Sequence, residues 1–214
     1  MDHLYLADCM EIIKTQEADV AFTSPPYNRK RNDKYQNYDD TVDDYFSFIK
    51  SVIDELKGVV KRHIILNLQP NYYNRADVYR LIGEYSSEIQ NIIVWEKSNP
   101  LPASGKNITN AYEFFIVIGK SALKANSTYT KNHITTSVNS ETTTKIHKAV
   151  MKQSVSDWFI ENFTLPGDTV IDPFMGLGTT GISCKKLGRN FIGSEINEQY
   201  YNIAKERIAN TERR

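Results

Sequence analysis

The 214-residue sequence has little of three things that mark specialised proteins: cysteine, net charge and long apolar runs. Its two cysteines, Cys9 and Cys184, form no C-x-x-C or metal-ligand spacing, which argues against a disulfide framework or a metal centre. Lys plus Arg and Asp plus Glu both total 26, so nucleic-acid binding would need a local basic patch. No apolar run approaches the roughly 20 residues of a membrane span, and no signal-peptide pattern follows Met1. We therefore expect a cytoplasmic protein with no metal site and no membrane partner.

The pattern of apolar residues is typical of an α/β domain. Hydrophobic residues make up 40% of the chain and charged residues 24%, ordinary values for a globular protein. Short apolar runs alternate with helical patterns, which favours a mostly parallel sheet covered on both faces. Strands are predicted at 4–6, 20–23, 63–68, 89–96, 114–118, 170–171 and 190–194. Apolar residues at helical spacing predict helices within 45–56, 78–85, 155–163, 179–187 and 200–208, with Asn74 and Asn197 as helix caps.

Two segments do not follow this pattern. Residues 29–44 are polar with scattered aromatics, and residues 120–146 are rich in Ser, Thr, Asn and Lys. Loops of this length inside a compact domain are usually functional or disordered.

A glycine-rich loop follows the strand predicted at 170–171. Gly176 and Gly178 allow a tight turn and the close approach of a ligand to bare backbone. The spacing is not that of a dinucleotide fingerprint, because the next glycine, Gly181, is one residue out of place. Glu195 ends the following predicted strand, where an acid commonly accepts hydrogen bonds from ribose hydroxyls. The alternative is a tight strand–helix turn beside a surface acid.

A second loop, Ser24-Pro25-Pro26-Tyr27, follows the strand predicted at 20–23. The two prolines fix the backbone and remove two donors, which leaves carbonyl acceptors in a stiff arrangement. Ser24 supplies another oxygen, and Tyr27 a flat face on which a base can stack. The lone pair of an amine on a heteroaromatic ring is delocalised into the ring. Acceptors that hold both N–H groups would favour tetrahedral geometry at the nitrogen and free this lone pair to attack an electrophile. The alternative is a rigid Pro-Pro turn. Because ligands bind at the carboxyl ends of parallel strands, we expect both loops to line one crevice.

In these motifs and their order, the sequence resembles the β class of S-adenosylmethionine-dependent DNA amino-methyltransferases, which methylate cytosine N4 or adenine N6. The resemblance covers nearly the whole chain. Three further runs match the family's blocks: Trp95-Glu96-Lys97-Ser98-Asn99-Pro100, Tyr112-Glu113 with the strand after it, and His147-Lys148-Ala149. The resemblance implies a Rossmann-like α/β fold, with a seven-stranded, mostly parallel sheet, one antiparallel strand and helices on both faces. It also implies a base flipped out of double-stranded DNA.

The resemblance assigns roles to individual residues. Ser24 and the Pro25 carbonyl would accept from the target amine and Tyr27 would stack on the base, while Glu195 would hold the ribose and Asp8 the adenine edge of the cofactor. The catalytic set is Ser24, Pro25, Pro26 and Tyr27. The cofactor-binding set is Asp8, Thr23, Asp172, Pro173, Phe174, Gly176, Gly178, Thr179, Thr180 and Glu195. The DNA-binding set, expected to contact phosphates, is Arg29, Lys30, Arg31 and Lys34.

The chain is expected to be a single catalytic domain, 1–214, in which residues 120–146 form a short loop in place of a large target-recognition domain. A homodimer is allowed, and the setting implied is a restriction-modification system, or a stand-alone enzyme, in a bacterial, archaeal or phage-infected cell. Ser24 before Pro-Pro favours cytosine N4, and Met151-Lys152 stands where adenine-type enzymes carry Lys-Pro. The alternatives are adenine N6, an RNA base or an amide as the acceptor, and a catalytically silent nucleic-acid-binding subunit.

Overall fold

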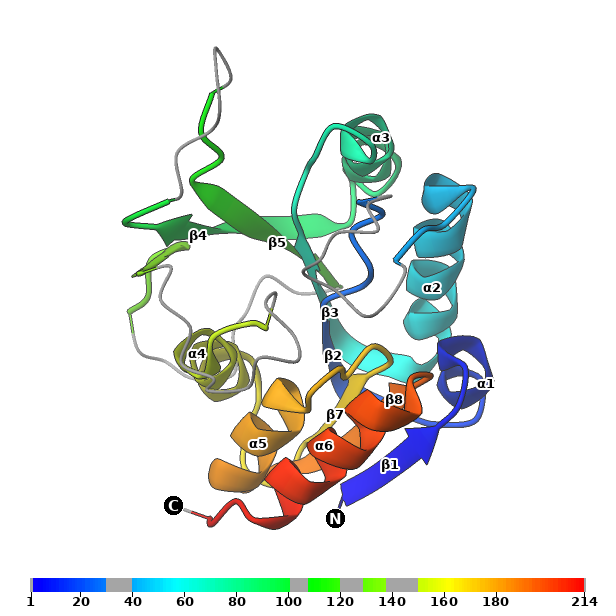
Figure 1. Cartoon of the computed structure of the whole chain (residues 1–214), viewed down its shortest axis with the longest axis vertical. Helices are drawn as coiled ribbons and strands as arrows, with labels where there is room; N and C mark the ends of the chain where they lie inside the picture. Colours follow the sequence, from blue (N-terminus) through cyan, green and yellow to red (C-terminus); the bar gives the residue numbers. More distant parts are fainter. Residues whose placement is uncertain (1, 30–39, 101–107, 120–128, 138–149, 214) are drawn as a thin grey trace.

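The computed structural model describes residues 2–29, 40–100, 108–119, 129–137 and 150–213, which form one mixed sheet with helices on both faces (Figure 1). The order across the sheet is β1-β8-β7-β2-β3-β5-β4-β6. Every neighbouring pair is parallel except the two that β5 makes, with β3 and with β4. The predicted Rossmann-like fold with one antiparallel strand is therefore confirmed. The described strands are β1 (Asp2–Leu6), β2 (Ala18–Thr23), β3 (Val60–Leu68), β4 (Ile89–Lys97), β5 (Tyr112–Gly119), β6 (His133–Thr136), β7 (Thr169–Asp172) and β8 (Asn190–Glu195).

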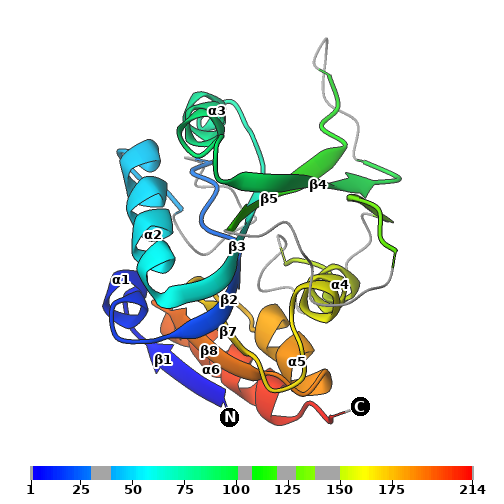
Figure 2. The ribbon, with the colours of Figure 1, turned by 180° about the vertical axis from the view of Figure 1, so that it is seen from behind.

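The helices divide between the two faces of the sheet. One face carries α1 (Cys9–Ile13), α2 (Tyr45–Val59) and α3 (Arg75–Glu84), and the other carries α4 (Gln153–Phe163), α5 (Thr179–Lys186) and α6 (Glu198–Ala209), as Figures 1 and 2 show from opposite sides. No helix in the described ranges is long and apolar enough to cross a membrane.

The strands bury both of their faces because successive side chains point to opposite sides of the sheet. In β2, Ala21 belongs to the core under α1, α2 and α3, whereas Val20 and Phe22 belong to the core under α4, α5 and α6. The two cores explain why the central strands are apolar at every position rather than at alternate ones. Phe159 of α4 packs in the core under α4, α5 and α6, with its ring centroid 4.2 Å from that of Phe115 on β5.

The sheet has one strand more than predicted within the described residues. β6 pairs in parallel with β4 at the edge of the sheet. It lies inside the segment 120–146, so the prediction of a loop throughout that segment is wrong for residues 133–136. None of its residues is fully buried, which is why its sequence carries no strong apolar signal.

The helix starts also differ in part from the prediction. Asn197 caps α6, since its side chain accepts a hydrogen bond from the backbone N–H of Tyr200 at 3.1 Å. Asn74 precedes α3 but makes no side-chain cap, because its Oδ1 accepts a hydrogen bond from the backbone N–H of Asn71 at 2.7 Å rather than from the first turn of the helix. The short helix α1 was not predicted, and Asp8 caps it by accepting from the N–H of Met10 at 2.8 Å.

Candidate active site

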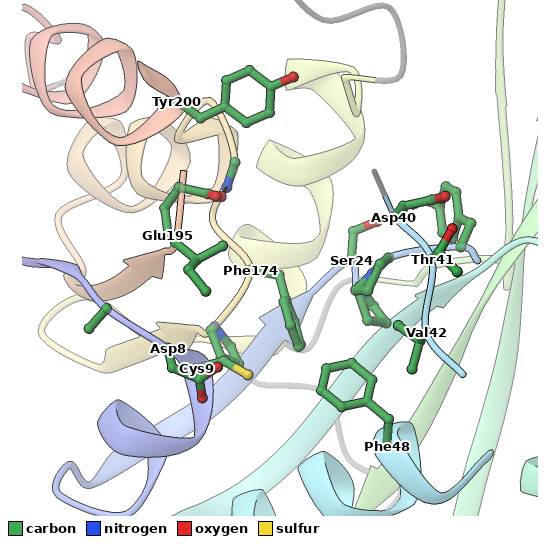
Figure 3. A pocket seen from close by; sticks show the side chains of 17 residues that line it. Asp8, Cys9, Ser24, Asp40, Thr41, Val42, Phe48, Phe174, Glu195 and Tyr200 are labelled. Atoms are coloured by element: carbon green, nitrogen blue, oxygen red, sulfur yellow. Dashed lines mark hydrogen bonds between the residues drawn. The ribbon is translucent and has the colours of Figure 1, made fainter. Parts of the chain in front are cut away.

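A cavity of about 220 Å³ opens at the carboxyl ends of β1, β8, β7 and β2, which are neighbours in the sheet (Figure 3). Ser24 and Gly176, from the two loops singled out in the sequence, both line it. The two loops therefore meet at one crevice because β2 and β7 lie side by side and run parallel, so that both loops leave the same edge of the sheet. The lining residues are Ala7, Asp8, Cys9, Ser24, Pro25, Pro26, Tyr27, Asp40, Thr41, Val42, Phe48, Pro173, Phe174, Gly176, Glu195, Ile196 and Tyr200.

A buried carboxylate behind the cavity ties the two loops together. Asp172 accepts hydrogen bonds from Thr23 Oγ1 at 2.6 Å, Thr180 Oγ1 at 2.7 Å and the N–H of Phe174 at 3.1 Å. Burial raises the pKa of Asp172 to about 6, against the opposing effect of these hydrogen bonds. Thr23, Asp172 and Thr180 were predicted to contact a cofactor, but they do not line the cavity; they hold the loops in place from behind.

The glycine-rich loop presents its backbone to the carboxylate at the end of β8. Gly176 has φ 52° and donates its N–H to Glu195 Oε2 at 3.0 Å. The N–H of Asn197 donates to Glu195 Oε1 at 2.8 Å, and burial raises the pKa of Glu195. This carboxylate is thus held at the cavity wall by backbone donors and keeps acceptor capacity for a ligand.

Gly178 lies at the start of α5, where it packs against α6. Its φ is 80°, and a Cβ at this position would lie 3.0 Å from the Cβ of Ala204 on α6. The missing side chain therefore lets α6 pack against the start of α5. Neither Gly178 nor Thr179 lines the cavity.

Apolar and acidic side chains share the end of the cavity near β1 and β8. Figure 3 shows Phe174 between Glu195 on one side and Ser24 on the other, with Asp8 near the start of α1. Phe48 of α2 meets Phe174 edge to face, with ring centroids 6.0 Å apart. A flat apolar wall flanked by two carboxylates suits an aromatic group that carries hydroxyl or amine donors.

The Ser-Pro-Pro-Tyr loop is fixed through the hydroxyl of Tyr27. This oxygen lies 2.9 Å from Ser24 Oγ, accepts from Asn67 Nδ2 at 2.8 Å, and donates to Glu113 Oε2 at 3.2 Å. Burial, and then the charge of Glu113, raise the pKa of Tyr27 well above its ordinary value. The guanidinium of Arg29 lies over the Tyr27 ring, 5.5 Å from its centroid.

Two asparagines fix the backbone of the same loop. Asn71 Nδ2 and Asn74 Nδ2 both donate to the carbonyl oxygen of Tyr27, at 2.7 and 2.9 Å. The amide nitrogen of Asn74 thus holds the loop, while its Oδ1 accepts from the N–H of Asn71 at 2.7 Å and does not cap α3.

Glu113, at the start of β5, was not predicted as a site residue. It is 5% exposed and accepts from Asn67 Nδ2 at 3.0 Å and Gln69 Nε2 at 3.3 Å, in addition to Tyr27 and an ion pair with Lys97. The runs containing Lys97 and Glu113 contributed to the family resemblance, but nothing in their spacing tells that they meet Tyr27.

A second missed group, Asp40 to Val42, borders the cavity where the chain returns to α2. The side-chain amide of Asn28 donates to the carbonyl of Val42 at 3.0 Å and accepts from its N–H at 3.1 Å. The N–H of Arg29 donates to the carboxylate of Asp40 at 3.0 Å. Of the predicted phosphate contacts, Arg29 is half-buried beside Tyr27 and Gln69, and Lys30, Arg31 and Lys34 lie outside the described residues.

Comparison with known proteins gives consistent results. The family described as DNA methylase matches residues 18–206. The Type II methyltransferase M.HinfI of Haemophilus influenzae is 27% identical over 94% of this chain and 66% of its own length. M.MwoI of Methanothermobacter wolfeii, also named a Type II methyltransferase, is 29% identical over 88% of this chain, which spans only 30% of that relative.

Two solved structures are similar over nearly the whole chain. The M1.HpyAVI–SAM complex has a TM-score of 0.71 at 28% identity, covering 97% of this chain and 99% of that one. PvuII DNA methyltransferase, titled cytosine-N4-specific, has a TM-score of 0.78 over 96% of this chain and 86% of that one. At 20% identity, the second likeness shows the fold alone.

Proposed function

The chain belongs to the DNA methylase family, and on that premise we propose that it transfers a methyl group from S-adenosylmethionine to the exocyclic amine of a base in double-stranded DNA. The observation that carries this proposal is the shared cavity, where the Ser-Pro-Pro-Tyr loop faces the glycine-rich loop. A methyl donor on one wall and an amine on the other would be placed for direct transfer, which is largely a matter of positioning.

The residues at the β1 and β8 end of the cavity fit S-adenosylmethionine. Glu195 offers carboxylate oxygens for the ribose hydroxyls, Asp8 offers an acceptor for the adenine amine, and Phe174 offers an apolar wall. At Gly176 even a Cβ would meet nothing nearer than 4.0 Å, so bare backbone is open to a ligand. When bound, the cofactor supplies an electrophilic methyl group. Pro173 adds to this wall, while Thr23, Asp172 and Thr180 act by holding the two loops, and Gly178 lets α5, which begins at Thr179, pack against α6.

Ser24 and the carbonyl of Pro25 would accept hydrogen bonds from the target amine. Such an amine is a poor nucleophile because its lone pair is delocalised into the ring. Two acceptors draw the nitrogen toward tetrahedral geometry, and Tyr27, with Pro26 beside it, provides a surface for the base. The base must leave the duplex to reach this cavity. The methylated nitrogen then loses its extra proton to solvent, so no strong general base is needed.

The proposed acceptor is cytosine N4, with adenine N6 as the alternative. Ser24 and Met151-Lys152 support cytosine through the family resemblance. Purified protein should be incubated with duplex DNA and isotope-labelled S-adenosylmethionine, and the nucleosides identified by mass spectrometry. Label on N4-methyldeoxycytidine supports the proposal, and label on N6-methyldeoxyadenosine transfers it to adenine. Label found on RNA or protein alone, or calorimetry that detects no cofactor binding, would reject a DNA methyltransferase.

The DNA itself is proposed to lie over the cavity mouth. Arg29, Lys30, Arg31 and Lys34 would contact phosphates, and residues 120–146 would contribute to site selection in place of a separate recognition domain. Replacing the four cations with Gln should flatten the slope of log affinity against log salt by about 0.9 per lost phosphate contact. Replacing Lys14 and Lys57, which pair with acids, is the matched control. An unchanged slope in the first variant would reject these contacts.

The relatives named Type II methyltransferases support a place for the chain in a restriction-modification system. A homodimer remains a prediction, which light scattering of the purified protein would test. A mass equal to that of one chain at all concentrations would contradict it.

A further inference from the structure

The hydroxyl of Ser24, at the cavity wall, is the end of a chain of hydrogen bonds that leads to the buried carboxylate of Glu113. The chain runs from Ser24 through Tyr27 to Glu113, whose carboxylate is surrounded by the donors Lys97, Asn67 and Gln69. The inference drawn from it rests on the proposed function, because it concerns how Ser24 meets the target base.

The direction of each hydrogen bond follows from counting protons. Glu113 is a carboxylate facing the ammonium of Lys97, so it can only accept, and the Tyr27 hydroxyl must donate its single proton to it. Asn67 Nδ2 donates one of its two protons to the Tyr27 oxygen and the other to Glu113. The opposite amide orientation would turn a carbonyl oxygen toward the carboxylate. The raised pKa of Tyr27 means that the phenol keeps the proton that it donates.

The contact between Ser24 and Tyr27, at 2.9 Å, is then no longer ambiguous. The only proton of Tyr27 is engaged with Glu113, so Ser24 must donate to the Tyr27 oxygen. Ser24 has no second proton to offer, and the lone pairs on its oxygen are what remains for the cavity.

We propose that Glu113, acting through Tyr27, fixes Ser24 as a hydrogen-bond acceptor toward the cavity and so selects an amino group over a carbonyl group at the target position. Glu113 is thus a positioning and specificity residue, which touches neither the cofactor nor the base. A base with an exocyclic amine donates an N–H to Ser24. The same ring with a carbonyl there, uracil for cytosine or hypoxanthine for adenine, brings a second acceptor against an acceptor.

The variant Glu113→Gln tests the proton direction with almost no change in shape. Its amide can donate to the Tyr27 oxygen, which lets Tyr27 donate to Ser24 and turns the proton of Ser24 toward the cavity. Tyr27→Phe removes the middle member and leaves the Ser24 hydroxyl free to rotate. Both variants should lower kcat by roughly tenfold, the effect of one misdirected hydrogen bond, with the KM for S-adenosylmethionine unchanged.

A binding measurement reports on selectivity without the reaction. The probe is an unmethylated duplex that contains the sequence recognised by the enzyme. The target base lies opposite an abasic site, so that flipping it out of the duplex costs little free energy. Wild-type protein should bind the amine base more tightly than its carbonyl counterpart, and Glu113→Gln should lose roughly tenfold of that preference. Glu96→Gln is the matched control, because Glu96 is a half-exposed acid on β4 that pairs with His133 and Thr135.

The double variant separates this role from a merely structural one. Once Tyr27 is Phe, Glu113→Gln has no path to Ser24 and should change neither kcat nor base preference further. Additive losses, or a Glu113→Gln variant with the preference of the wild type, would overturn the inference. If Glu113→Gln does not fold, Tyr27→Phe alone decides, since an unchanged preference there is equally fatal. A wild-type protein that methylates no DNA would instead mark the failure of the proposed function.

Discussion

The buried carboxyl of Asp172 makes a quantitative prediction about stability and pH. Its pKa is about 6 in the folded chain, against an ordinary value of 3.8, because burial disfavours the charge more than three hydrogen bonds favour it. At about 1.4 kcal/mol per pKa unit, this difference corresponds to about 3 kcal/mol of folding free energy.

The sign follows from proton binding. Between pH 3.8 and about 6, the folded chain holds a proton on Asp172 that the unfolded chain has already lost. The stabilisation is thus complete below the unfolded pKa, falls as the pH rises toward 6, and is absent above it. Asp172→Asn keeps the shape and cannot ionise, and the Thr23 and Thr180 hydroxyls can rotate to suit the amide. We expect its free energy of unfolding, relative to wild type, to rise by about 2 kcal/mol between pH 4.5 and 7.5.

Urea unfolding of the wild-type protein and of Asp172→Asn between pH 4.5 and 7.5 measures the difference in their free energies of unfolding. The titrations of all other groups are common to both proteins and cancel in this difference. Asp43→Asn, which removes an exposed carboxylate from the stretch before α2, is the control and should show no such trend. A difference between Asp172→Asn and wild type that stays constant with pH would refute the reasoning, because it would mean that Asp172 ionises as easily inside the protein as outside.

Three further predictions concern the neighbouring residues. Gly178→Ala should lower the free energy of unfolding by about 2–4 kcal/mol in urea titrations, since it adds a Cβ against Ala204 at φ 80°. Gly167→Ala is the control: it has φ 90° but lies in open space, so it should lower the free energy of unfolding by only about 1–2 kcal/mol. Equal losses in the two variants would contradict this reasoning. Glu195→Gln should weaken S-adenosylmethionine binding roughly tenfold in calorimetry, because a charge-assisted acceptor becomes a neutral amide, and unaltered affinity would remove Glu195 from the cofactor site. Asn74→Ala should lower kcat for methylation while the helix content measured by circular dichroism stays constant, because Asn74 holds the carbonyl of Tyr27 and does not cap α3. A loss of helix with intact kcat would show that Asn74 stabilises α3 and not the loop.

The sequence by itself determined the elements other than α1 and β6, and it determined the two loops. A strand between two helical layers is apolar at successive positions, and Val20, Ala21 and Phe22 show this without any knowledge of their partners. Ser24 and Gly176 were identified because each lies just beyond such a run, where a parallel sheet collects its ligand-binding loops. β6 was missed since an edge strand with half-exposed residues need not carry an apolar pattern.

Only the tertiary structure decided which polar groups face the cavity and which support it. Thr23 and Asp172 belong to the predicted motifs, yet they point at each other behind the wall. Glu113 and Asn67 stand in ordinary strand sequence, and their meeting with Tyr27 depends on the pairing of β3 with β5. The reason is physical: local patterns record which side of a sheet a residue occupies, whereas the partner of a buried polar group is set by chain segments that come together only on folding.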